Sequence, residues 1–154
     1  MLYEIGNPSD CVTFEAHDDK IAAAVVLLLG SGQYFLNRED DSRVDVPVLL
    51  FVRDEKAADE MLNEYFGGDY GAYVSGNKPA IAEALESCLC MSFSSRKTVA
   101  MAGEHMSADE FVKYKAKVNE ERRSSMNNIC GRAYHYAKQL REPPKNGRKR
   151  KQAV

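Results

Sequence analysis

The sequence of 154 residues contains no tryptophan and no apolar run long enough to cross a membrane. Its longest apolar run, residues 21–29, has nine residues, whereas a membrane-spanning helix needs about 20. The N-terminal residues, Met-Leu-Tyr-Glu-Ile, lack the basic region and apolar stretch of a signal peptide. We therefore expect a cytoplasmic protein with no membrane partner.

Recognised catalytic and metal-binding motifs are missing as well. The three histidines fit no metal or triad pattern, and we predict no catalytic residue, no metal, no cofactor and no enzyme activity. The cysteines match no zinc-binding spacing, so we expect thiols in a reducing cytoplasm, with a metal or redox role as the alternative. They are Cys11, Cys88, Cys90 and Cys130.

The net charge of −2 is unevenly distributed along the chain. Residues 141–151 contain six Lys and Arg against one Glu, so the remainder is acidic. An acidic body argues against binding of duplex DNA. We predict one α+β ligand-binding domain over residues 1–142 and a disordered basic tail over residues 143–154, because the tail has nothing to bury.

The N-terminal third of the chain predicts a small antiparallel sheet. Residues 2–6 and 11–16 read as a hairpin, since the residues between them favour a turn. Further strands are expected at residues 33–37 and 46–52, and the second of these is expected to be central because its apolar run is continuous. Residues 38–43 form a charged loop between them.

Helices account for most of the remaining chain. Asp18 and Gly30 are typical of the start and end of a helix that is apolar all round, which the sheet, other helices or a second subunit must cover. Further helices are expected from Asp54 to Gly67, at residues 80–90 and 96–102, from a capping box at residues 107–110, and at residues 126–140, with breaks at residues 69–78 and 92–95. The fold class is therefore α+β, with the sheet packed against several C-terminal helices.

The densest polar cluster lies between the last two predicted helices. It contains two guanidinium groups, two hydroxyls and two amides, and a helix start there would add backbone N–H groups, which together suit a phosphate. The candidate ligand-binding residues are Arg122, Arg123, Ser124, Asn127 and Asn128. In the alternative interpretation, the arginines close one helix and Ser124 caps the next.

A second candidate cluster is Ser-Phe-Ser-Ser-Arg at residues 92–96. Here Phe93 is a candidate for stacking on a base and Arg96 for binding a phosphate. The alternative is that Phe93 belongs to the hydrophobic core.

Several segments together resemble a phage protein family. They are Leu-Tyr-Glu-Ile-Gly-Asn-Pro-Ser-Asp at residues 2–10, residues 21–32 with their Gly-Ser-Gly end, Arg-Ser-Ser-Met-Asn-Asn-Ile at residues 123–129, and Gly-Arg-Ala at residues 131–133. In these the chain resembles the first-described Thoeris anti-defence proteins, which act as sponges for an immune signal. The likeness extends over about residues 2–140.

The resemblance implies sequestration of a cyclic ADP-ribose isomer, such as glycocyclic ADP-ribose, in the cytoplasm of the infected bacterial host. The signal would be bound without cleavage, so that Thoeris immunity is blocked. It further implies a homo-oligomer, from a dimer to a hexamer, and cyclic di- or trinucleotides as additional ligands. Phe93 and an arginine of the pair Arg122 and Arg123 would contact the ligand, with Asn127 and Asn128 beside them.

Two other functions stay open at this point. One is a protein-binding inhibitor of a bacterial defence system, similar to an anti-CRISPR protein, which needs no ligand pocket. The other is a small hydrolase of the same signal, which would need an activated nucleophile that the sequence does not reveal.

Overall fold

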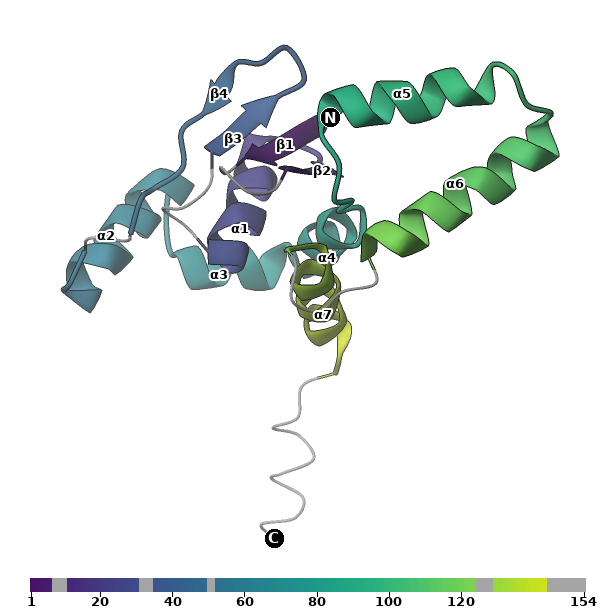
Figure 1. The fold of residues 1–154 in the computed structure, drawn as a ribbon. Coiled ribbons are helices and arrows are strands. Elements are labelled where there is room, and N and C mark those ends of the chain that lie inside the picture. Colours follow the sequence, from purple (N-terminus) through teal and green to yellow (C-terminus); the bar gives the residue numbers. More distant parts are fainter. Residues whose placement is uncertain (7–10, 31–34, 50–51, 124–128, 144–154) are drawn as a thin grey trace, which may run out of the picture.

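In a computed structural model, the chain folds into a four-stranded sheet with helices on both sides of it (Figure 1). The structure describes residues 1–6, 11–30, 35–49, 52–123 and 129–143, and for Arg122 and Arg123 it describes the backbone alone. The predicted turn at residues 7–10 and the predicted tail from residue 144 onward lie outside the described residues.

All strands are antiparallel and lie in the order β2-β1-β3-β4. They are β1 (Leu2–Gly6), β2 (Cys11–Glu15), β3 (Phe35–Arg38) and β4 (Arg43–Val44). The predicted hairpin is confirmed, with Ile5 opposite Val12. The predicted α+β class, with its N-terminal antiparallel sheet, is confirmed as well.

The fourth strand lies elsewhere than the sequence predicted. The charged segment that was expected to be a loop, residues 38–43, leads into β4, which ends at Val44. Residues 46–49 and 52 are not strand. Pro47 has no N–H to donate to a sheet, and the Val52 N–H donates to the Leu49 carbonyl at 3.0 Å instead. Val48 is 52% exposed, so the described part of this apolar run is no central strand.

Helix α1 (Asp19–Gly30) packs its apolar side chains against one face of the sheet. The Asp18 carboxylate accepts a hydrogen bond from the Ile21 N–H at 2.9 Å, and Gly30 ends the helix with a φ of 125°. Helices α4 (Lys78–Glu86) and α7 (Ile129–Arg141) contact α1 and each other. The coverage expected for this apolar helix therefore comes from within the chain.

Helices α2 (Glu55–Phe66) and α3 (Tyr70–Gly76) follow the irregular segment. The predicted start and end of α2 are confirmed by an Asp54 cap and by Gly67, whose φ is 73°. The expected loop at residues 69–78 is wrong. Asp69 accepts from the Ala72 N–H at 3.1 Å, and the Tyr70 and Tyr73 rings pack on Phe66, so capping and aromatic packing form a helix despite two glycines.

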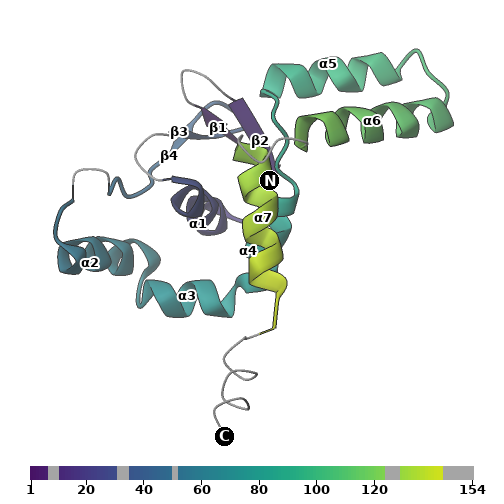
Figure 2. The same cartoon turned by 60° about the horizontal axis from the view of Figure 1, so that its bottom comes forward.

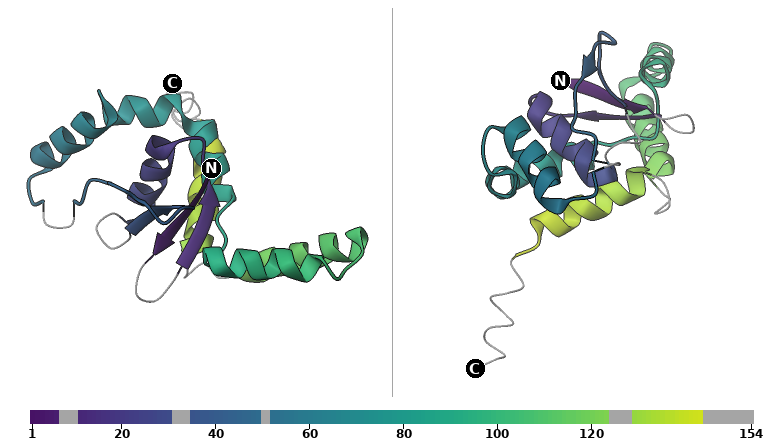
Figure 3. Two further views of the ribbon diagram at one scale, coloured as in Figure 1. Left: turned by 90° about the horizontal axis from the view of Figure 1, so that it is seen from above. Right: turned by 90° about the vertical axis from the view of Figure 1, so that its left-hand side faces the viewer.

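Helices α5 (Phe93–Gly103) and α6 (Ala108–Arg123) form an antiparallel pair that projects from the rest of the molecule (Figures 2 and 3). We call this pair, residues 93–123, the arm. The expected break at residues 92–95 is wrong, because Ser92 caps α5 by accepting from the Ser95 N–H at 3.1 Å. The capping box before α6 is confirmed by the reciprocal bonds of Ser107 and Glu110.

Two of the four cysteines are not the thiols that the sequence suggested. Cys90, before α5, and Cys130, in α7, form a disulfide with Cα atoms 6.0 Å apart. Cys11 and Cys88 take no part in it. Pairing across 40 residues depends on the fold, so spacing alone did not reveal it.

None of the described helices combines the length and the apolar character that a bilayer crossing requires. The longest, α6, has 16 residues and carries charged side chains along its length.

Candidate functional site

A cavity of about 320 Å³ lies between the two helices of the arm and the segment that leads into them. This volume falls in the range of small-molecule sites, about 300–1,000 Å³. Its walls come from that segment, from α5 and from α6. The lining residues are Leu89, Met91, Arg96, Val99, Ala100, Phe111, Lys115 and Asn119.

The segment at residues 88–91 forms the inner wall and is fixed to the sheet. Leu89 pairs with Thr13 of β2 through two backbone hydrogen bonds, each of 2.9 Å. Leu89 and Met91 are both nearly buried, at 7% and 4% exposure. The wall is therefore an extension of the sheet rather than a loose loop.

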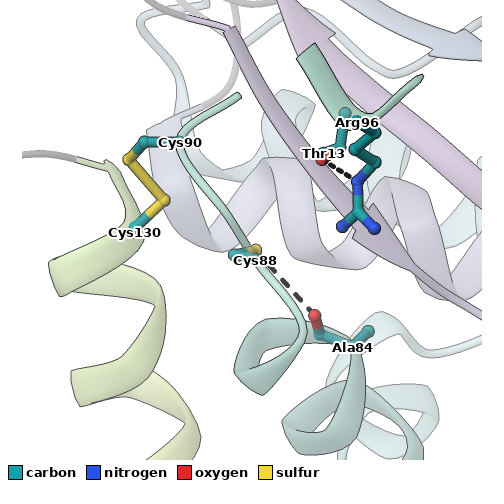
Figure 4. Close-up of a disulfide and its surroundings, with 6 residues drawn as sticks. All are labelled: Thr13, Ala84, Cys88, Cys90, Arg96 and Cys130. Atoms are coloured by element: carbon teal, nitrogen blue, oxygen red, sulfur yellow. Dashed lines mark hydrogen bonds between the residues drawn. A yellow bond between two sulfur atoms is a disulfide. The ribbon is translucent and has the colours of Figure 1, made fainter. Parts of the chain in front are cut away.

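The start of α5 is anchored to the face of the sheet opposite α1. The Phe93 N–H donates to the Glu4 carboxylate at 2.8 Å, an acceptor that suits the positive end of a helix. Three residues later, the Arg96 Nε donates to the hydroxyl of the fully buried Thr13. Figure 4 shows the Arg96 side chain beside β2 with its Nε facing that hydroxyl. These contacts fix the position of Arg96 in the cavity wall.

The opposite wall comes from one face of α6. Phe111, Lys115 and Asn119 are four residues apart, so they lie along one side of the helix. The Lys115 ammonium lies 4.6 Å from the centre of the Phe111 ring. At the far end, α5 and α6 approach closely because residue 103 is glycine: a Cβ there would lie 2.6 Å from the Phe111 ring.

The chemistry of the wall suits an anion that carries a flat or apolar group. Arg96 and Lys115 supply two cations, Asn119 supplies an amide, and the eight described lining residues include no carboxylate. Guanidinium and ammonium groups bind phosphate oxygens, while Phe111 and the aliphatic side chains offer apolar contact. The arm as a whole holds seven Lys and Arg against five Asp and Glu, although the chain is acidic.

The predicted site residues are only partly described. Arg96 lines the cavity, whereas Phe93 is half-buried at the start of α5, outside the lining set. The backbone of Arg122 and Arg123 continues α6 one helical turn beyond Asn119. Ser124, Asn127 and Asn128 lie outside the described residues, so their role stays a prediction.

Sequence reasoning missed Lys115, Asn119 and Phe111 as candidates. The four-residue spacing of an aromatic, a cation and an amide on α6 was the available signal. The sequence alone does not reveal that this face of α6 lies against α5 and Arg96.

Another polar cluster joins α1 to the sheet and has a structural role. Asp19 accepts hydrogen bonds from the Tyr3 hydroxyl at 2.8 Å and from Arg38 Nη2 at 2.7 Å. The Arg38 hydrogen bond holds the pKa of Asp19 below its usual value, and burial raises the pKa of Tyr3. All three groups are satisfied by one another, so the cluster offers little to a ligand.

A second hollow, of about 240 Å³, lies between the N-terminus and α4. Its walls include Glu15 and Glu83, and the Met1 ammonium group donates to the Ala16 carbonyl. Two carboxylates make it a poor site for an anion.

Comparison with known proteins adds no information on the candidate site. No protein family, curated protein or solved structure matches the chain. The resemblance to the Thoeris anti-defence proteins therefore stays a prediction from the sequence.

Proposed function

We propose that the protein is a phage anti-defence protein that binds a nucleotide immune signal in the arm cavity and holds it without cleaving it. The observation that carries this proposal is the pairing of Arg96 from α5 with Lys115 and Asn119 from α6 around one cavity. The backbone of Arg122 and Arg123, which belong to the predicted phosphate cluster, lies one turn further along α6 than Asn119.

The ligand class follows from the wall. A cyclic ADP-ribose isomer carries a pyrophosphate and an adenine, which match two cations and an apolar wall with an aromatic ring. Glycocyclic ADP-ribose is one such isomer, and cyclic di- or trinucleotides share the same chemistry. Sequestration of such a signal in the host cytoplasm would block Thoeris immunity.

Binding without turnover is supported by the side chains of the wall. The eight described lining residues include no His, Asp, Glu, Ser, Thr or Cys, so among them no pair of a nucleophile and its activating base faces the cavity. A hydrolase of the same signal is therefore the weaker candidate.

A homo-oligomer is part of the proposal. The arm exposes Met101 at 61% and Val112 at 62%, and the outer face of the sheet exposes Phe35 at 53%. Apolar side chains exposed on a projecting pair of helices suit contact with another chain. The same observation favours the second candidate function, a protein-binding inhibitor of a defence system.

Calorimetric titration with glycocyclic ADP-ribose tests the proposal. Lys115→Ala is expected to weaken binding by about ten- to a hundredfold, because a hydrogen bond to a charged group contributes about 1.5–3 kcal/mol. Lys113→Ala is the matched control, since Lys113 is exposed on the same helix and does not line the cavity. Equal affinity of the two variants would remove the cavity from the proposal.

Arg123→Ala tests the predicted phosphate cluster separately. We expect loss of nucleotide binding with little change in the melting temperature. An unfolded variant would make Arg123 structural, whereas unchanged binding would confine the site to the arm cavity.

Two further changes test the other sequence predictions. Phe93→Ala is expected to weaken binding of the nucleotide. Deletion of residues 143–154 is expected to leave binding intact.

A further inference from the structure

The disulfide lies directly behind the inner wall of the cavity. Cys90 stands between Leu89 and Met91, and both of these neighbours line the cavity. Residues 89–91 form a tight turn, in which the Met91 N–H donates to the Leu89 carbonyl at 2.8 Å, and Cys90 at its centre is not among the residues that line the cavity. Figure 4 shows Cys90 joined to Cys130 at the start of α7.

The same bond closes the base of the arm. Cys90 and Cys130 are 40 residues apart, and the whole arm lies between them in the sequence. Within the described residues, it is the disulfide that joins the two ends of the arm covalently. The arm therefore enters and leaves the body of the molecule through one cross-linked point.

The described residues of the arm bury little surface that could replace this link. Helix α5 has no buried residue, and no described residue of α6 is buried. The wall itself is held to the sheet by the Thr13–Leu89 pair, and α5 by its contacts with Glu4 and Thr13. All of these contacts are made with β1 or β2. The disulfide, in contrast, ties the wall to α7.

We propose that the Cys90–Cys130 disulfide is a redox-sensitive latch that sets the affinity of the cavity for its anionic ligand. This inference rests on the proposed function, because it concerns the regulation of the same site. In the oxidised protein, Leu89 and Met91 are held in place before the ligand arrives. In the reduced protein, ordering this wall opposes binding and lowers the affinity.

The latch opens by thiol–disulfide exchange with a dithiol reductant. A thiolate of the dithiol attacks the Cys90 sulfur, because Cys90 is half-buried whereas Cys130 is 1% exposed. The Cys90–Cys130 bond breaks, a mixed disulfide forms, and Cys130 leaves as a thiolate that takes up a proton. The second thiol of the reductant then releases Cys90, so the dithiol is oxidised and two cysteine thiols result.

The experiment compares the oxidised full-length chain with the same chain treated with dithiothreitol. Calorimetric titration with glycocyclic ADP-ribose is expected to show about tenfold weaker binding after reduction. Amide hydrogen exchange without ligand is expected to accelerate at residues 89–91 and in α5 on reduction. Alkylation of accessible thiols before and after treatment, read by mass spectrometry, establishes that Cys90 and Cys130 change state.

Two variants sharpen the result. Cys11→Ser is the matched control, because Cys11 takes no part in the disulfide, and it is expected to respond to dithiothreitol as the unchanged chain does. Cys90→Ser combined with Cys130→Ser is expected to bind weakly in either condition. If that double variant fails to fold, the comparison of oxidised and reduced unchanged chain decides the question by itself.

The outcomes separate the latch from the proposed function. Equal affinity and equal exchange in the two states would overturn the latch, as would complete alkylation of Cys90 and Cys130 before any reductant is added. No binding in either state would overturn the proposed function and the latch with it, whereas binding of equal strength in the two states would overturn the latch alone.

Discussion

The body of the molecule and its arm are held together by different physics. In the body, Tyr3, Ile5, Val12 and Phe14 of the sheet are 0% exposed and pack against α1. In the arm, no residue of α5 is buried, and Met101 and Val112 are more than half exposed. Burial of apolar surface therefore stabilises the body, while the arm depends on capped helix starts, polar contacts with the sheet and a disulfide.

This difference assigns separate tasks to the two regions. A projecting pair of helices with little buried surface contributes little to the stability of the chain by itself. It nevertheless carries two cations that face one cavity, together with exposed apolar side chains. The arm thus carries the candidate site, and the body is the platform that holds its base.

The largest contrast is expected between Phe14→Ala and Val112→Ala. Truncating a fully buried phenylalanine should lower the free energy of unfolding by about 3–5 kcal/mol, whereas the exposed valine should change it by less than about 0.5 kcal/mol. Denaturation by urea measures both. Similar losses in the two variants would mean that the arm is packed against something in solution.

Gly103→Ala tests the close approach of the arm helices. The added Cβ would meet the Phe111 ring at 2.6 Å, so we expect destabilisation of about 1–3 kcal/mol, as overpacking generally causes. Hydrogen exchange should accelerate in α5 and α6 and stay unchanged in the sheet. Faster exchange in the sheet as well would show that the arm and the body unfold as one unit.

Thr13→Val tests the polar contact between the two regions. Valine keeps the shape of threonine but removes the hydroxyl that accepts from Arg96, so we expect a loss of about 1–2 kcal/mol in stability. Ligand affinity should fall too, because Arg96 loses its fixed position. Unchanged affinity in this variant would mean that Thr13 does not position Arg96 for binding.

Asp19→Asn is expected to have the smallest effect, and one confined to the body. The Arg38 hydrogen bond lowers the pKa of Asp19, so this carboxylate stabilises the fold at neutral pH, and the stabilisation is lost as the pH falls through its folded pKa. The melting temperatures of the two proteins should differ at pH 7, and the difference should shrink as the pH falls below the ordinary value for an aspartate, about 3.9. A constant difference across this range would contradict the assignment.

The predictions from sequence succeeded where local chemistry decides the structure. The hairpin, the Asp18 and Gly30 ends of α1, and the Ser107 capping box depend on residues close together in the chain, and each is confirmed. The wrong predictions concern segments in which two local signals compete, or contacts between residues that are far apart in the sequence. Pro47 kept an apolar run out of the sheet, and Asp69 capped a helix where glycines suggested a loop.

The candidate site was less predictable than the fold. Arg96 was identified from its neighbours, but Lys115 and Asn119 became candidates only when α6 was seen to lie against α5. The Cys90–Cys130 pair was invisible for the same reason, since it joins residues 40 positions apart. Spacing in the sequence does not report which helices meet in space.

The most direct test of the central claim is to recover the ligand. The purified protein would be incubated with glycocyclic ADP-ribose, separated from unbound nucleotide, and heated, and the released molecule would be weighed by mass spectrometry. We predict release of the intact nucleotide from the unchanged chain, and much less from a chain carrying both Arg96→Ala and Lys115→Ala. A hydrolysed product, or no retained nucleotide at all, would contradict it.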